Sequence, residues 1–483
     1  MSRARRIAII GAGPGGICAG VRLQQAGYSD ITVFEKSANV GGTWHNTRYP
    51  GLACDVQSHL YAFSFAPNPH WSRTYVTQPE ILAYMQAVAD RFGLSPLLRL
   101  NTKVTGAEWD EACAQWRLTT DAGEESAYDI VISAIGMFND LAWPDIPGLA
   151  DFKGTVFHAA PWKPDHDFSN RRVSVIGSAA SAVQFVPEIA AKTAQLYVHQ
   201  RSAPWISPKS DPLYDEAAQA RFAAQPGLVD AIREKLYKGI EAFVTLGEEQ
   251  LAQGAQAGLT NLLAVRDEAL RSKLTPTSPF GCMRPLLTSD YYPVFNRDNV
   301  ELVTSPIVGV VADRVVTEDG VHRPVDTIIC ATGYHVRRFL SAIAVTGRRG
   351  RRIVDDWRDG AEAYLGLLTT GYPNLFQMYG PNTNNGSITF MLECQAEFIV
   401  NHLEMMDRQD LAWIDVKADV QARYNHGLRC DLEQVTVWNA GCHNYYREPS
   451  GRNVTQWPHT MTAYRDACAA VDQAIFDAAA VSA

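Results

Sequence analysis

The sequence predicts an α/β protein with two Rossmann-like dinucleotide-binding domains, one inserted in the other, and with a helical insertion. Two observations carry this prediction. A short apolar run leads into a turn of small residues twice along the chain, at residues 7–16 and 173–182. Two later apolar segments that end in glycine, residues 129–136 and 326–333, resemble each other. Each of them would close one of the two nucleotide-binding units.

The first turn has every feature of a dinucleotide-binding fingerprint. The apolar run Ile7 to Ile10 enters Gly11-Ala12-Gly13-Pro14-Gly15-Gly16. A strand, a tight turn and a helix start in this order bring backbone N–H groups to a pyrophosphate. Glu35 stands nineteen residues after Gly16, at the end of the run Ile31 to Phe34. Because a carboxylate there accepts from ribose hydroxyls and repels a 2′-phosphate, this turn is predicted to bind FAD.

The second turn repeats the spacing with the opposite charge. The run Val173 to Ile176 enters Gly177-Ser178-Ala179-Ala180-Ser181-Ala182, and Arg201 stands nineteen residues after Ala182. An arginine at that position accommodates a 2′-phosphate, so this turn is predicted to bind NADP(H). Alanine replaces two expected glycines, and an ordinary strand-to-helix turn is the alternative. The repeated spacing favours the nucleotide site.

Composition limits the class of protein. The chain has 483 residues, 46% of them hydrophobic, which suggests about three domain-sized units. A net charge of −9 gives no electrostatic reason to expect nucleic acid or an anionic membrane as a partner. Nine scattered cysteines without a C-x-x-C pair favour a reduced cytoplasm and argue against a disulfide reductase. Cys442-His443 has no second pair at metal-ligand spacing, so no metal is expected.

The order of the motifs predicts how the chain is divided. The second turn and its closing segment lie between the first closing segment and a likely strand at residues 375–379, so the NADP-binding domain is inserted in the FAD-binding domain. Residues 215–273, rich in Ala, Leu, Glu and Gln, read as a helical insertion, and the alanine-rich residues 467–483 as an amphipathic helix. The expected parts are 1–145 (FAD), 146–214 (NADP), 215–273 (helical), 274–333 (NADP) and 334–483 (FAD).

Two longer motifs make the prediction more specific. One has the spacing F-x-G-x-x-x-H-x-x-x-W, from Phe152 through His158 to Trp162, and the other runs from Gly41 to Asp55 as GGTWHNTRYPGLACD. Both resemble motifs of type I Baeyer–Villiger monooxygenases, within the class B flavin monooxygenases. Further similarity runs through residues 280–285, 331–334, 379–383 and 451–453, so the resemblance covers nearly the whole chain in family order.

The resemblance implies a reaction and two catalytic residues. NADPH reduces FAD, reduced flavin captures O₂ as a C4a-peroxyflavin, and the anionic peroxide attacks a ketone to give an ester or lactone. Arg284 resembles the arginine that stabilises the peroxyflavin, and Asp55 the carboxylate that orients this arginine. The alternatives are a structural arginine and a helix N-cap. For His158 a hinge role is favoured over a general base, and Trp162 is expected to pack the linker.

The cofactor contacts follow from the two turns and from the resemblance. Trp44 is expected near the flavin. The predicted cofactor-binding residues are Gly11, Gly13, Pro14, Gly15, Gly16, Glu35, Lys36, Gly42, Thr43, Trp44, Asp55, Tyr61, Val104, Gly177, Ser178, Ala179, Ser181, Gln184, Arg201, Ser202, Arg284 and Asn382.

Three departures from the family leave alternatives open. Met283 replaces a lysine that helps to hold the 2′-phosphate, Lys163 follows Trp162 as in N- and S-oxygenating relatives, and Asn444-Tyr445-Tyr446 replaces Ser-Trp-Tyr in a loop over NADP. The prediction is a cytoplasmic Baeyer–Villiger monooxygenase acting on a small-molecule ketone and O₂, a monomer or weak homo-oligomer without membrane attachment. The alternatives are an N- or S-monooxygenase, an NAD(P)H:flavin reductase or oxidase, and a non-enzymatic nucleotide sensor.

Overall fold

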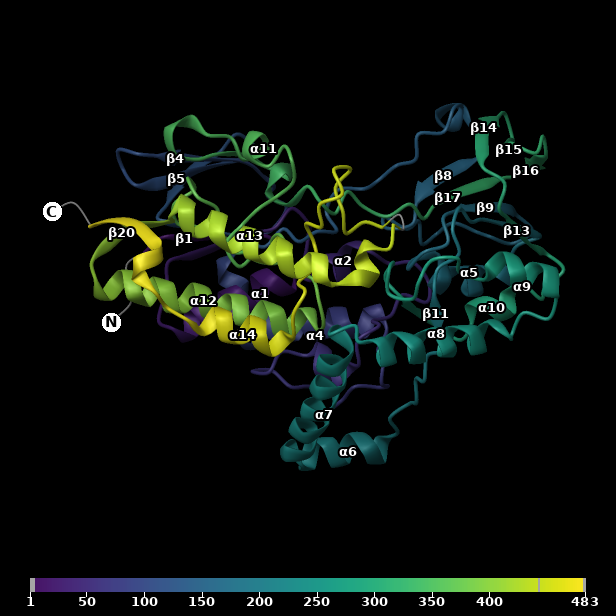
Figure 1. Ribbon diagram of the computed structural model, residues 1–483, viewed down its shortest axis with the longest axis horizontal. Coiled ribbons are helices and arrows are strands. Elements are labelled where there is room, and N and C mark those ends of the chain that lie inside the picture. Colours follow the sequence, from purple (N-terminus) through teal and green to yellow (C-terminus); the bar gives the residue numbers. More distant parts are fainter. Residues whose placement is uncertain (1–4, 442–443, 481–483) are drawn as a thin grey trace.

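The structure is a computed structural model that describes residues 5–441 and 444–480. Two lobes lie side by side, each built around a parallel sheet, and helices α6 and α7 project below the junction between them (Figure 1). Both described ends of the chain belong to the same lobe (Figure 1). This arrangement places the carboxyl ends of strands from both sheets near the junction, where open α/β sheets bind their ligands.

The first sheet has the order β19-β7-β1-β2-β3 and is parallel throughout. Its last strand in the chain, β19, pairs with β7 although the whole second sheet lies between them in sequence. Helices α1 and α12 pack together against this lobe. The bounds are β1 Ile7–Ile10, β2 Ile31–Phe34, β3 Leu98–Arg99, β7 Ile130–Ser133, β19 Leu375–Gln377, α1 Pro14–Gln25 and α12 Ile388–Arg408.

The second sheet has the order β13-β10-β9-β17-β8 and is also parallel. Its strand order repeats that of the first sheet. The strand before the turn, β9, lies between β10 and the closing strand β17, as β1 lies between β2 and β7. The predicted fold class is therefore confirmed. The bounds are β8 Thr155–His158, β9 Arg172–Ile176, β10 Gln195–His199, β13 Val300–Val303, β17 Thr327–Cys330 and α5 Ala182–Ala190.

Each lobe carries a small sheet with three antiparallel strands ahead of its closing strand. In the first lobe β18 adds to β4, β5 and β6, and in the second lobe β14, β15 and β16 form the sheet. The bounds are β4 Val104–Asp110, β5 Gln115–Thr120, β6 Glu125–Tyr128, β18 Ala344–Thr346, β14 Ile307–Val311, β15 Arg314–Thr317 and β16 His322–Pro324.

The segment between residues 215 and 274 folds into α6 Glu216–Ala224, α7 Pro226–Val244, α8 Glu248–Leu262 and α9 Glu268–Leu274. Asp215 caps α6 by accepting from the backbone N–H of Ala218 at 2.7 Å, and Asp267 caps α9 in the same way at 2.6 Å. The exact domain boundaries stay a prediction.

The prediction of an amphipathic helix over residues 467–483 is wrong for most of that segment. Helix α14 (Met461–Ala469) ends soon after residue 467, and β21 (Phe476–Ala480) pairs antiparallel with β20 (Leu411–Val416). The pairing satisfies backbone groups along β20 and buries Phe476, and these tertiary contacts override the helix propensity of alanine. Residues 481–483 of the expected helix lie outside the described residues.

Two further sequence expectations bear on the described residues. Among residues 5–441 and 444–480, no helix combines the length and apolar character that crossing a membrane requires. Cys18, Cys54, Cys113, Cys330, Cys394, Cys430 and Cys468 are free thiols. Cys282 is disulfide-bonded, which the dispersed spacing did not predict.

Candidate active site

A cavity of about 1500 Å³ lies between the two lobes. It is lined by the turns after β1 and β9, by the segments after β7 and β17, and by part of α7. Single-ligand pockets usually measure about 300–1000 Å³, so this cavity has room for more than one bound molecule. That size suits a site in which two nucleotides and a substrate meet.

At two positions of the first turn, Gly11 and Gly16, only glycine fits. Gly11 has φ +105°, and a Cβ added there would lie 2.6 Å from the carbonyl oxygen of Ala134, just after β7. A Cβ on Gly16 would lie 1.8 Å from the carbonyl oxygen of Gly11. The turn therefore folds back tightly onto the strand and presents its N–H groups at the start of α1.

Glu35 is fixed at the end of β2 by this turn. Its side chain is buried, and its two carboxylate oxygens accept from the backbone N–H groups of Ala12 and Ser37, each at 2.8 Å. Glu35 also lines the cavity. A carboxylate held in this way is already oriented to accept hydrogen bonds from ribose hydroxyls.

The second turn repeats the first but is more open. Gly177 has φ +110°, and its added Cβ would lie 2.6 Å from the carbonyl oxygen of Ala331, just after β17. This contact is the counterpart of the one between Gly11 and Ala134. Ala182, the first residue of α5, occupies the position equivalent to Gly16 of the first turn. Arg201 and Ser202 follow β10 and are exposed.

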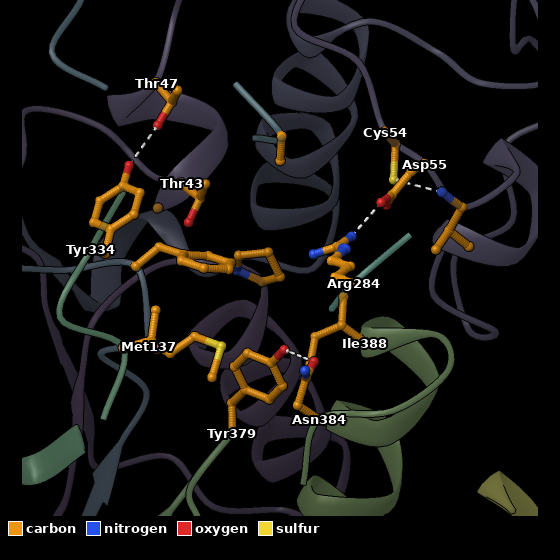
Figure 2. Close-up of a pocket in the computed structure, with 18 of the residues that line it drawn as sticks. Thr43, Thr47, Cys54, Asp55, Met137, Arg284, Tyr334, Tyr379, Asn384 and Ile388 are labelled. Atoms are coloured by element: carbon orange, nitrogen blue, oxygen red, sulfur yellow. Dashed lines mark hydrogen bonds and ion pairs between the residues drawn. The ribbon is translucent and has the colours of Figure 1, made fainter. Parts of the chain in front are cut away.

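Arg284 and Asp55 form an ion pair at the cavity wall. Figure 2 shows the Asp55 carboxylate beside the Arg284 guanidinium, whose nitrogens point toward the middle of the cavity. The charge of Asp55 raises the pKa of Arg284 further above its ordinary value, so the guanidinium stays protonated. The side chains are 40% and 31% exposed respectively, which leaves Arg284 able to contact a ligand.

The alternative role for Asp55, a helix N-cap, does not match the structure. Helix α3 (Ser58–Tyr61) starts after Gln57, and no side chain caps it. Asp55 instead directs its carboxylate at Arg284. The pair joins the loop before α3 to the segment before β12 (Leu286–Leu287), so it connects parts of the chain that are far apart in sequence.

Most of the predicted cofactor-binding residues meet at the cavity. Those that line it are Gly11, Gly13, Pro14, Gly15, Glu35, Lys36, Gly42, Thr43, Trp44, Asp55, Tyr61, Val104, Ala179, Ser181, Gln184 and Arg284. Within the described chain, the predicted residues away from its lining are Gly16, Gly177, Ser178, Arg201, Ser202 and Asn382. The amide of Asn382 donates to the carbonyls of Asn453 and Gln456 at 3.1 and 3.0 Å.

Several lining side chains were not predicted. Tyr379 donates its hydroxyl to Asn384, whose amide donates to Gln456, and all three line the cavity (Figure 2). Residues 379–383 belong to the family similarity, but nothing in their spacing predicts that Tyr379 faces the cavity. Trp44, which was predicted, donates its indole N–H to the hydroxyl of Tyr61 at 2.9 Å.

The linker motif, residues 152–162, packs against neighbouring side chains and does not line the cavity. His158 is buried, its Nδ1 accepts from the N–H of Ala160 at 3.1 Å, and burial lowers its pKa. Trp162 packs against Phe157 and Phe185, as the sequence predicts. A neutral, buried histidine beside a domain joint fits the hinge role better than that of a general base.

The sequence predicts no metal site. Cys442-His443, which has no second pair at metal-ligand spacing, lies outside the described residues. Within residues 5–441 and 444–480, no group of three or more His, Cys, Asp or Glu side chains is arranged to hold a metal ion.

Comparisons with known proteins first define a class. Residues 8–241 match the pyridine nucleotide-disulphide oxidoreductase family. A steroid monooxygenase structure bound to NADP has a TM-score of 0.87 and 30% identity, with 98% of this chain and 99% of that chain covered. A cyclohexanone monooxygenase from Rhodococcus sp. Phi1, bound to NADP+, has a TM-score of 0.89 and 27% identity over all of both chains. The fold is that of two-domain flavin monooxygenases with FAD and NADP domains.

Curated relatives then give the family. A Baeyer–Villiger monooxygenase from Pseudomonas aeruginosa is 40% identical over 468 residues, covering 95% of this chain and 89% of the relative. One from Streptomyces coelicolor is 40% identical over 481 residues, covering 97% of this chain and 92% of the relative. The chain belongs to the Baeyer–Villiger monooxygenase family. The family predicted from the sequence is thus confirmed.

Proposed function

We propose that this protein is an FAD-containing, NADPH-dependent Baeyer–Villiger monooxygenase that converts ketones to esters or lactones with O₂. The observation that carries the proposal is the Asp55–Arg284 ion pair at the cavity where the two nucleotide turns meet. A reductase needs only the two turns. A fixed positive charge in the shared cavity is what oxygen insertion requires in addition.

The residues of the first lobe fit FAD. The tight turn at Gly11 and Gly16 sets backbone N–H groups at the start of α1, where they would bind a pyrophosphate, and Glu35 is held at the end of β2, where it would accept from a ribose. The chemistry that FAD supplies when bound is hydride acceptance from NADPH and electron transfer to O₂. We assign NADPH to the second turn, where Ala179, Ser181 and Gln184 line the same cavity.

Arg284 supplies the positive charge that distinguishes this enzyme from a reductase. Its guanidinium holds a permanent positive charge where an anionic oxygen must be stabilised before it attacks the ketone carbonyl. Asp55 orients the guanidinium and keeps it at the cavity wall. Because both side chains are partly buried at the cavity wall, these charges act in a medium that screens less than bulk water.

We also propose the residue assignments and boundaries that the comparisons leave untested. Residues 1–145 and 334–483 would form the FAD-binding domain, and residues 146–214 and 274–333 the NADP-binding domain. The two sheets support this division, since β19 returns to the first sheet after the second is complete. Lys163, the cue for heteroatom oxygenation, lies over the Phe157 ring at 5.8 Å and does not line the cavity.

The direct test is product analysis with a panel of cyclic and linear ketones, together with a sulfide and a tertiary amine. The proposal expects esters or lactones from ketones, with one NADPH consumed for each product. Sulfoxide or N-oxide as the main product would favour the heteroatom alternative. NADPH oxidation that yields only hydrogen peroxide with every compound would favour an oxidase.

A further inference from the structure

Helix α7 forms one apolar wall of the cavity. Leu236, Ile240 and Phe243 line the cavity and recur at positions i, i+4 and i+7, which lie on one face of a helix. Val244 continues this wall at the end of the helix, and Lys235, which also lines the cavity, precedes Leu236. The helix therefore presents mainly hydrocarbon to whatever the cavity holds.

Polar contacts on another face hold α7 in this orientation. Arg233 donates to the carbonyl of His59 at 3.2 Å, the Tyr237 hydroxyl hydrogen-bonds to Thr462, and Glu241 accepts from the N–H of Met461 at 2.9 Å. Arg233, Tyr237 and Glu241 are four residues apart and so form a stripe of their own. Because this stripe is anchored to α3 and to the start of α14, the apolar stripe cannot rotate away from the cavity.

Gly239 stands next to the apolar wall, is exposed and has no side chain. It lies in the middle of α7 and lines the cavity, and a Cβ added there would meet no atom within 4 Å. Its φ is not positive, so neither the backbone nor packing requires glycine. Gly254 of α8 differs, because its added Cβ would lie 2.3 Å from the Phe280 ring. A side chain at position 239 would therefore extend into the open space of the cavity without displacing a neighbouring atom.

We propose that Gly239 is a specificity-determining residue, which admits ketones with a bulky apolar ring or chain. This inference rests on the proposed function and names the substrate class. The carbonyl group would lie toward Arg284, and the hydrocarbon part would pack against the wall of α7 and fill the space at Gly239. Filling that space with a side chain excludes large ketones and leaves small ones unaffected.

The test substitutes Gly239→Leu and compares cyclohexanone with cyclododecanone. We expect kcat/KM for cyclododecanone to fall about tenfold or more, mainly through KM, and that for cyclohexanone to stay within about twofold. The matched control is Gly227→Leu on the same helix, where an added Cβ also meets no atom within 4 Å but which does not line the cavity. An unchanged ratio between the two ketones in Gly239→Leu would overturn the inference.

A binding measurement separates this inference from the proposed function. Ketone binding to the FAD-loaded enzyme without NADPH is followed by the change in flavin absorbance, and the Kd ratio of the two ketones is compared between the wild type and Gly239→Leu. A shift of that ratio against cyclododecanone supports the inference even if neither ketone is oxidised, an outcome that would contradict only the proposed function. An equal Kd ratio in both proteins contradicts the inference whatever the turnover shows.

Discussion

The two nucleotide turns share one backbone design but differ in how completely they are built. In both turns the first glycine packs against the carbonyl of an alanine that follows the closing strand. The FAD turn adds a second tight contact at Gly16 and a buried, doubly hydrogen-bonded Glu35. The NADP turn has Ala182 and an exposed Arg201 instead. We infer that the first turn retains its cofactor and that the second exchanges its nucleotide.

The largest effect that tests this comparison is expected at Gly16. Gly16→Ala places a methyl group 1.8 Å from the Gly11 carbonyl, and the turn must open to accept it. We expect the purified variant to contain little or no FAD, measured as visible flavin absorbance per protein. The matched control is Ala182→Gly at the equivalent position, which should retain FAD and lose only about 0.5–1 kcal/mol of stability. Normal FAD content in Gly16→Ala would show that the tight turn does not hold the cofactor.

The next effect is expected where the two sites meet. Arg284→Ala should keep FAD and still oxidise NADPH, because hydride transfer requires only that the two nucleotides lie close together. Ester formation should fall by about two to three powers of ten, the usual cost of removing one electrostatic contact to a developing anion. NADPH consumption and ester yield measured in the same reaction check this. Ester formation near the wild-type rate would remove Arg284 from the mechanism.

A smaller effect is expected at the exposed arginine. Arg201→Ala should raise KM for NADPH roughly ten- to a hundredfold, since a hydrogen bond to a charged group is worth about 1.5–3 kcal/mol. KM for NADH should change little, because NADH has no 2′-phosphate. Met283→Lys should widen the preference for NADPH. Equal use of both nucleotides by the wild type, together with an unchanged KM in Arg201→Ala, would show that the second turn is misread.

The smallest effect is expected from the partner of Arg284. Asp55→Asn keeps the shape of the side chain but removes its charge, so Arg284 is oriented less well and is not lost. We expect ester formation to fall about tenfold, the cost of weakening one charged hydrogen bond. The uncoupled NADPH oxidation should rise in the same assay. A loss as large as that in Arg284→Ala would mean that Asp55 acts on the substrate or cofactor directly.

The sequence predicts the parts of this molecule whose signals are local. Glycine turns at Gly11 and Gly177 require particular backbone angles, and the buried strands before them have short apolar runs, so the sequence alone locates both turns. The role of Tyr379 and the wall formed by α7 depend on contacts between segments far apart in the chain, which no spacing encodes. The C-terminal strand β21 was missed for a related reason, because alanine favours a helix until β20 offers it a partner.

The most direct test of the central claim is the fate of oxygen. The enzyme is supplied with NADPH, a ketone that it binds and isotopically labelled O₂, and the product is analysed by mass spectrometry. The account predicts an ester or lactone that carries one labelled oxygen atom for each NADPH consumed, and in Arg284→Ala labelled hydrogen peroxide in its place. Labelled hydrogen peroxide without labelled ester from the wild-type enzyme, over the whole ketone panel, would contradict it.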